Sequence, residues 1–180
     1  NMELKGSKTE ANLMAAFAGE SQARNKYTFA AEQAKKEGYR QIAQIFTDTA
    51  DNERAHANLW YRILHGDRTE STQLNLRDAA SGENYEWTEM YKTFAQEAKE
   101  EGFDRIAFLF EAVGKIEQEH EKRFLKLAEN TEENLVFRKD SVTVWQCRNC
   151  GHIHVAVDAP SVCPVCGEPQ SYFQMKEENY

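Results

Sequence analysis

The sequence contains two copies of the motif Glu-x-x-His, Glu53-Arg-Ala-His56 and Glu117-Gln-Glu-His120. A spacing of three residues places a carboxylate and an imidazole one turn apart on the same face of a helix. Carboxylate oxygens and imidazole nitrogens are ligands that iron accepts. Two such helices, with a glutamate from each of two partner helices, make up the di-iron and di-manganese carboxylate bundles. The repeated motif therefore predicts a two-metal centre.

Two further glutamates are needed to complete this centre, and Glu20 and Glu83 are the candidates. Glu20 lies seven residues before Tyr27, so both side chains belong to one stripe of a helix. Glu83 follows a glycine, as Glu20 does. Tyr27 and its counterpart Tyr91 have two interpretations, as hydrogen-bond partners of the ligating carboxylates or as packed core residues.

Four helices are expected to position these residues, because apolar residues recur at helical spacing over about the first 130 positions. The first helix is predicted to begin near a cap at Thr9 or an adjacent residue and to end just before Gly38. The others are predicted over residues 39–65, 83–101 and 103–129. In the second helix, the side chains expected to face inward are Ile42, Ile45, Phe46, Ala50 and Leu59.

Residues 66–80 lack a strong hydrophobic period and are expected to connect the second helix to the third. An extended chain of roughly 15 residues reaches about 50 Å, which is enough to cross the length of a bundle. A single long crossover is typical of the ferritin-like topology. The predicted fold class is mainly α, a ferritin-like four-helix bundle followed by a small domain.

The two halves of the helical part repeat each other at an offset of 64 residues. Between positions 27 and 56 the repeat has eleven identities, which predicts a duplicated helical hairpin. The pairs are Tyr27/Tyr91, Ala31/Ala95, Ala34/Ala98, Lys35/Lys99, Glu37/Glu101, Gly38/Gly102, Ile42/Ile106, Ala43/Ala107, Phe46/Phe110, Glu53/Glu117 and His56/His120.

The repeat slips by one residue between Glu83 and Tyr91, and Glu86 lies inside this window. A single inserted residue in a helix is commonly absorbed as a π-type turn, often at a functional site. We therefore expect a π-type distortion near residues 84–90 that turns Glu86 toward the metals. The alternative is that Glu86 is an ordinary surface glutamate.

Four cysteines near the C-terminus form two Cys-x-x-Cys pairs, Cys147/Cys150 and Cys163/Cys166. Two such pairs predict one tetrahedral metal site, and four thiolates suit either zinc or a single iron. A glycine directly follows each pair, where a tight turn lets backbone N–H groups approach the sulfurs. Trp145, Tyr172 and Phe173 are expected to form the small core of this domain, and His152 and His154 are expected at its surface.

The composition limits the classes of partner. The formal net charge of −8 argues against nucleic acid or an anionic membrane, because both attract clustered positive charge. No apolar run approaches the roughly 20 residues of a membrane span, and the acidic residues within positions 1–18 argue against a signal peptide. Paired cysteines that suit a metal site rather than disulfides indicate a reducing compartment, so a cytoplasmic location is expected.

At this point the chain resembles the rubrerythrins, over nearly its whole length. The motifs that carry the resemblance are Leu-Lys-Gly-Ser-Lys-Thr-Glu, Ala-Phe-Ala-Gly-Glu20-Ser-Gln-Ala-Arg-Asn-Lys-Tyr27, Gly-Glu83-Asn-Tyr-Glu86-Trp-Thr-Glu-Met-Tyr91, His120-Glu-Lys-Arg-Phe and Trp-Gln-Cys147-Arg-Asn-Cys150-Gly. The resemblance implies a ferritin-like di-iron domain over residues 1–138 and a rubredoxin-like four-cysteine iron domain over residues 139–180, with zinc possible in the latter.

The resemblance also implies a peroxidase that reduces hydrogen peroxide to water and protects against oxidative stress. The ligands of the oxidised iron pair would be Glu20, Glu53, Glu83, Glu86, Glu117 and His120. His56 would replace Glu86 on one iron when the pair is reduced. Electrons would come from a rubredoxin or an NADH-dependent flavoprotein reductase through the four-cysteine iron, within a head-to-tail homodimer.

Two other functions share parts of this pattern. A ferroxidase or iron-handling protein has the same bundle but does not need the four-cysteine module. A binding module with a structural zinc ribbon leaves the glutamates at core positions without a role.

Overall fold

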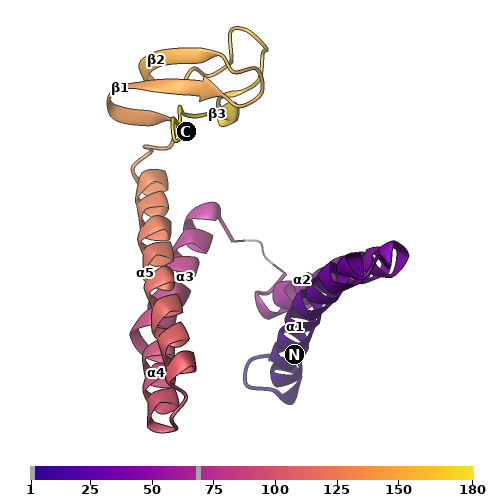
Figure 1. Ribbon diagram of the computed structural model, residues 1–180. Coiled ribbons are helices and arrows are strands. Elements are labelled where there is room, and N and C mark those ends of the chain that lie inside the picture. Colours follow the sequence, from indigo (N-terminus) through magenta and orange to yellow (C-terminus); the bar gives the residue numbers. More distant parts are fainter. Residues whose placement is uncertain (1–2, 68–69) are drawn as a thin grey trace. The chain divides into compact units, whose positions relative to one another are not determined.

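The computed structural model describes residues 3–67 and 70–180. The chain divides into two compact units, Asn1–Thr69 and Glu70–Tyr180. The first unit is a helical hairpin, and the second contains another helical hairpin followed by a three-stranded sheet (Figure 1). Over the described parts of the chain, no helix combines the length and the apolar character that crossing a membrane requires.

The first hairpin consists of α1 (Lys8–Lys36) and α2 (Arg40–Leu64). The Ser7 hydroxyl caps α1 by accepting a hydrogen bond from the backbone N–H of Glu10 at 3.0 Å. The cap, predicted at Thr9 or an adjacent residue, thus lies two residues before Thr9, which is already inside the helix. A serine that bonds the N–H group three residues later is a standard N-cap.

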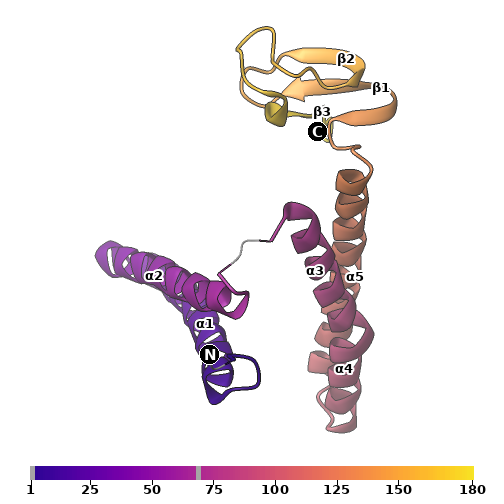
Figure 2. The ribbon, with the colours of Figure 1, turned by 180° about the vertical axis from the view of Figure 1, so that it is seen from behind.

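The second hairpin packs a segmented helix against one continuous helix, as the view from behind also shows (Figure 2). The segmented helix comprises α3 (Thr72–Tyr85), the π-helical turn η1 (Glu86–Met90) and α4 (Tyr91–Glu100), and its partner is α5 (Asp104–Glu132).

The predicted start of the third helix after Gly82 is wrong. The helix begins at Thr72, and the Ser71 hydroxyl caps it by accepting a hydrogen bond from the backbone N–H of Leu74 at 3.2 Å. The expected crossover over residues 66–80 is thus helical from Thr72 onward, and its residues 68 and 69 lie outside the described residues.

Both hairpins turn in the same way. The backbone N–H of Tyr39 donates to the carbonyl of Ala34 at 2.9 Å, and the N–H of Phe103 donates to the carbonyl of Ala98 at 2.7 Å. This six-to-one bond defines a Schellman motif, which needs a left-handed residue that glycine adopts without strain. The glycines at this place are Gly38 (φ 88°) and Gly102 (φ 84°).

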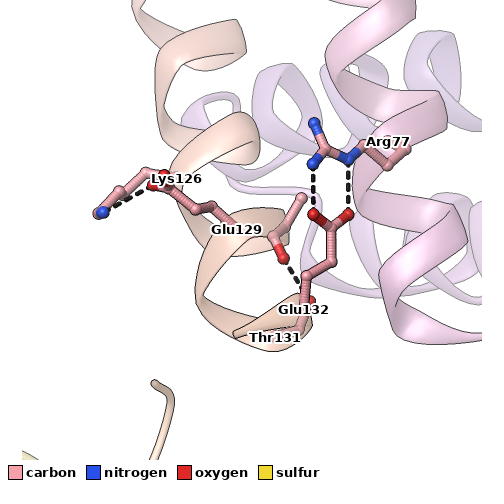
Figure 3. Close-up of polar contacts among 6 residues, drawn as sticks. Arg77, Lys126, Glu129, Thr131 and Glu132 are labelled. Carbon is pink, nitrogen blue, oxygen red and sulfur yellow. Dashed lines mark hydrogen bonds and ion pairs between the residues drawn. The ribbon is translucent and has the colours of Figure 1, made fainter. Parts of the chain in front are cut away.

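An ion pair joins the first turns of α3 to the last turn of α5. The Arg77 guanidinium donates to both carboxylate oxygens of Glu132, from Nε at 2.8 Å and from Nη2 at 2.6 Å (Figure 3). The planar fork of arginine matches a carboxylate in this way. Both side chains are partly exposed, so the pair fixes the position of α3 more than it adds stability.

Alanine forms the seam inside each hairpin. Every buried residue of the described helices is an alanine, namely Ala31, Ala34, Ala43, Ala50, Ala57, Ala80, Ala95, Ala98, Ala107 and Ala128. Small side chains allow two helices to approach closely. Ile42, Ile45 and Leu59 are 47%, 58% and 49% exposed on this hairpin, so their inward orientation in a four-helix bundle stays a prediction. Two helices bury only their seam and leave the larger apolar side chains outside it.

The C-terminal sheet has the order β2-β1-β3, and both pairings are antiparallel. Its strands are β1 (Arg138–Cys147), β2 (Ile153–Asp158) and β3 (Phe173–Met175), with the short 3₁₀ turn η2 (Gln170–Tyr172) before β3. Trp145 and Phe173 form its core with Cys147 and Cys163, as predicted in part. The prediction for Tyr172 is wrong, since this side chain is 40% exposed and its neighbour Phe173 points inward.

Candidate metal centres

The first hairpin brings Glu20 of α1 together with Glu53 and His56 of α2. One ligand atom from each of these three residues, the first triad, lies within 4.8 Å of the others. His56 Nδ1 is 2.9 Å from an oxygen of Glu53 and 3.6 Å from an oxygen of Glu20. Two oxygens and one nitrogen therefore converge on one point of the helical surface.

The second hairpin repeats this arrangement with Glu83 of α3 and with Glu117 and His120 of α5, the second triad. His120 Nδ1 is 2.7 Å from an oxygen of Glu117 and 3.4 Å from an oxygen of Glu83. The carboxylates are mostly shielded, at 14% and 20% exposed. Each hairpin thus carries one half of the predicted ligand set.

The aromatic residues beside the triads confirm the duplication. The ring centres of Tyr27 and Phe46 are 6.0 Å apart, and those of Tyr91 and Phe110, at the equivalent places, are 5.9 Å apart. This contact bears out the packing interpretation of the two tyrosines. Their predicted hydrogen bonds to ligating carboxylates remain a prediction.

In both triads, closely spaced carboxylates shift the pKa values of one another. The pKa of Glu20 is raised, mainly because its carboxyl shares a hydrogen bond with Glu53. The pKa of Glu53 is lowered by that bond and by the hydrogen bond with His56. In the second triad, burial raises the pKa of Glu83, and the hydrogen bond with Glu117 adds to the effect. A bound cation would replace the proton that each pair of carboxyls holds.

The π-type distortion predicted near residues 84–90 is confirmed. The π-turn η1 spans Glu86–Met90, and the backbone N–H of Tyr91 donates to the carbonyl of Glu86 five residues earlier. Glu86 is half-buried. The pKa of Tyr91 is raised by burial and then by the charges of Glu86, Glu117 and Glu83. The role of Glu86 as a ligand remains a prediction.

A clamp that sequence reasoning missed holds the π-turn against α5. The Trp87 indole N–H donates to one oxygen of Glu121, and the Asn84 amide donates to the other at 3.0 Å. At the offset of 64 residues, the position of Glu121 corresponds to Ala57. The sequence could have indicated the clamp, because the repeat replaces Ala57 by the charged Glu121 directly after His120.

The four cysteines converge on one point of the C-terminal domain, with Sγ atoms within 4.8 Å of one another. The Cys147–Cys166 and Cys150–Cys163 sulfur distances are 3.8 and 3.6 Å. Metal–sulfur bonds of about 2.3 Å in a tetrahedron place the sulfurs about 3.8 Å apart. These side chains fit one tetrahedral metal ion.

Backbone N–H groups reach two of the sulfurs, as the glycines after each pair led us to expect. A hydrogen bond from the His152 backbone lowers the pKa of Cys150, but burial and the three neighbouring sulfurs raise it to about 12. A hydrogen bond from the Glu168 backbone, with one from Asn149, lowers the pKa of Cys166 to about 6. His152 and His154 are half-buried, and neither belongs to the four-residue group.

Comparison with known proteins assigns both metal-binding parts. A family model described as Rubrerythrin matches residues 11–128, and another, described as Rubrerythrin, rubredoxin-like domain, matches residues 145–174. Rubrerythrin of Porphyromonas gingivalis is 48% identical over 100% of this chain and 96% of its own. Rubrerythrin-1 of Clostridium acetobutylicum and rubrerythrin of Nitratidesulfovibrio vulgaris are 48% and 45% identical, over 98% of each chain.

These matches confirm the predicted fold class, a ferritin-like helical part followed by a rubredoxin-like domain. Rubrerythrin domains bind a di-iron centre, and the rubredoxin-like domain carries the four-cysteine site. The family consists of oxidoreductases, and its rubredoxin-like domain indicates a part in electron transfer. The chain belongs to the rubrerythrin family.

Proposed function

We propose that this chain is a di-iron peroxidase that reduces hydrogen peroxide to water and protects against oxidative stress. The observation that carries the proposal is the pair of matching triads, each of which presents two carboxylates and one imidazole. Oxygen and nitrogen donors in this combination suit iron. One triad on each hairpin provides for two metal ions, which is the number that a two-electron reaction requires when each iron gives one electron.

The proposed ligands are the six residues of the two triads and Glu86. The chemistry supplied by the bound iron pair is a two-electron reduction, in which hydrogen peroxide takes up two electrons and two protons, its O–O bond breaks and two waters form. Glu86 would be a ligand of the oxidised pair, and His56 would take its place in the reduced state. An additional anionic ligand favours the higher charge of ferric iron, whereas a neutral nitrogen ligand suits the lower charge of ferrous iron.

Tyr91 and the triad carboxylates differ in whether they keep their protons. Burial and three nearby carboxylates raise the pKa of Tyr91, so its hydroxyl keeps its proton at neutral pH and is available as a donor. The shared hydrogen bonds within each triad hold protons that leave when the carboxylates bind a cation. With metal bound, Tyr91 is thus the side chain that keeps a proton close to the place of reaction, because the triad carboxylates have released theirs.

Electrons enter one at a time through the four-cysteine site, which we propose holds iron. The four thiols are free rather than paired in disulfides, which suits a reducing, cytoplasmic location. We propose a rubredoxin or an NADH-dependent flavoprotein reductase as donor, and domains over residues 1–138 and 139–180. A head-to-tail homodimer would place the four-cysteine domain of one copy beside the iron pair of the other.

Turnover of protein prepared without oxygen, with one oxidant added at a time, tests the proposal. Iron-loaded protein is mixed with a reduced rubredoxin-type donor and with either hydrogen peroxide or dioxygen, and donor oxidation is followed by absorbance. The proposal predicts fast oxidation with peroxide, one peroxide consumed for every two electrons, and a much slower reaction with dioxygen. Preferred use of dioxygen with iron(II) as the substrate would favour a ferroxidase instead.

A further inference from the structure

A polar groove lies between α1 and α2 of the first hairpin. It has a volume of 480 Å³, and its lining includes Arg24 and Asn25 of α1 with Arg54 and Asn58 of α2. Arg54 and Asn58 follow Glu53 by one and five residues, which turns them about 100° and about 140° around the helix from that triad side chain. This groove, the arginine groove, therefore opens away from the first triad and is separate from it.

The arginine groove gathers positive charge. Among the described residues, the arginines that form ion pairs are Arg77 and Arg138. Arg24 and Arg54 are exposed and form none there, and the groove has no acidic side chain in its lining. Two such guanidinium groups at one groove favour an anion, because the planar fork of arginine binds a carboxylate or phosphate through two hydrogen bonds.

The second hairpin holds a carboxylate at the corresponding place. There the Glu121 carboxylate accepts a hydrogen bond from the Trp87 indole on the facing helix. Arg24 has the position of Trp87, since each lies four residues after the triad glutamate of its helix. Ala57 has the position of Glu121, and it lines the arginine groove without a charge. The first hairpin thus has a donor on α1 but lacks a carboxylate on α2 for it to hold.

The arginine groove also has an aromatic wall. Phe17 and Tyr61 line it, and the centres of their rings are 5.6 Å apart. An apolar group of a ligand can pack against such rings. Small-molecule sites typically have volumes of about 300–1,000 Å³, and the groove lies within this range. It therefore has room for more than a bare ion.

We propose that the arginine groove binds a small organic anion, whose carboxylate or phosphate group lies between Arg24 and Arg54 and whose apolar part packs on Phe17 and Tyr61. The bound anion supplies on the first hairpin the negative charge that Glu121 supplies on the second, and it ties α1 to α2. The inference does not depend on the proposed function, because the groove contains none of the proposed metal ligands.

Calorimetric titration of the full-length, iron-loaded protein tests the proposal with four probes. Phenyl phosphate and benzoate combine a ring with either anionic group; both are expected to bind once per chain, and the tighter of the two identifies the preferred group. Inorganic phosphate lacks the ring and should bind more weakly, and benzyl alcohol lacks the charge and should not bind. Inorganic phosphate that binds as tightly as phenyl phosphate would overturn the organic ligand. No binding of either ring-bearing anion at millimolar concentration would overturn the site.

The arginines are tested one at a time. Arg24→Ala and Arg54→Ala are each expected to weaken binding of phenyl phosphate at least about tenfold, because each removes charge-assisted hydrogen bonds to the anion. Arg40→Ala is the matched control, since Arg40 carries the same charge and is exposed at the start of α2. Unchanged affinity in both groove variants would overturn the proposal and assign the bound anion to the iron pair.

Ala57→Glu tests the comparison with the second hairpin. The added carboxylate is expected to occupy the arginine groove and to abolish binding of phenyl phosphate. A folded Ala57→Glu variant that binds phenyl phosphate as tightly as wild type would contradict the assigned position of the anion. Ala57 is only 8% exposed, so if this substitution prevents folding, the two arginine variants decide.

Discussion

The indole N–H of Trp87 donates a hydrogen bond to the carboxylate of Glu121, and this bond ties the π-turn to α5. Glu121 immediately follows His120, so the clamp joins the one irregular turn of the hairpin to the helix that carries two residues of the second triad. The first hairpin has alanine at the corresponding position, Ala57. The two halves of the duplication therefore differ at the place where Glu86 is added.

The clamp is expected to stabilise the π-turn measurably. Trp87→Phe removes the N–H donor and keeps a ring, and Glu121→Ala removes the acceptor. Because hydrogen bonds to charged groups contribute about 1.5–3 kcal/mol, the double-mutant cycle should give a coupling energy of that size. Thermal or denaturant unfolding of the metal-free protein measures it. Lys122→Ala, on an exposed neighbour, serves as control, and a coupling energy near zero would show that the bond has no structural role.

Replacing Glu86 by alanine should slow peroxide turnover by at least about tenfold, because the oxidised pair loses the ligand that the π-turn supplies. The absorption spectrum of the four-cysteine iron should not change. Glu89→Ala is the matched control, since Glu89 lies in the same π-turn and is exposed. Equal turnover of the two variants would contradict the role given to Glu86.

Deleting Glu89 tests the π-turn itself, without removing any proposed ligand. The deletion restores the spacing of the first hairpin, so the helix should continue as regular α-helix and rotate Glu86 by about 100° relative to the residues after it. The expected result is a folded protein whose turnover falls as far as that of Glu86→Ala. Wild-type turnover in the deletion variant would show that the irregular turn is dispensable.

The raised pKa of Glu83 predicts how the metal-free protein responds to pH. Glu83 binds a proton more readily in the folded state than in the unfolded state. The contribution of Glu83 to the free energy of unfolding is therefore fully present below its ordinary pKa of 4.5, and it is lost as pH rises through the raised pKa. Glu83→Gln removes this loss. At pH 7 the metal-free variant should unfold at a higher temperature than metal-free wild type, with Glu119→Gln as the exposed control. A variant with the same pH dependence as wild type would contradict this cause.

The sequence predicted the side chains that converge in each triad and the π-turn, because both depend largely on spacing along a helix. The two triads, the paired turns at Gly38 and Gly102, and the distortion at Glu86 all follow from the repeat and its slip of one residue. Spacing is a local property, and the three-residue step of Glu-x-x-His fixes which side chains meet.

The sequence did not predict features that depend on contacts between residues on different segments of the chain or on the orientation of single side chains. The start of α3 was placed too late, because Gly82 was taken for a helix boundary, although it lies inside a helix that Ser71 caps. Tyr172 was assigned to the core together with its neighbour Phe173, although only Phe173 is buried, since composition does not tell which of two adjacent aromatic residues points inward. Glu121 was missed because its partner Trp87 lies 34 residues away, on another helix.

The most direct test of the peroxidase function is a titration of fully reduced protein with hydrogen peroxide in the absence of oxygen, followed by Mössbauer spectroscopy. The account predicts that one molar equivalent of peroxide converts both irons of each pair from the ferrous to the ferric state within the mixing time, before the four-cysteine iron reacts. A pair that stays ferrous after one equivalent, or a four-cysteine iron that is oxidised first, would contradict it.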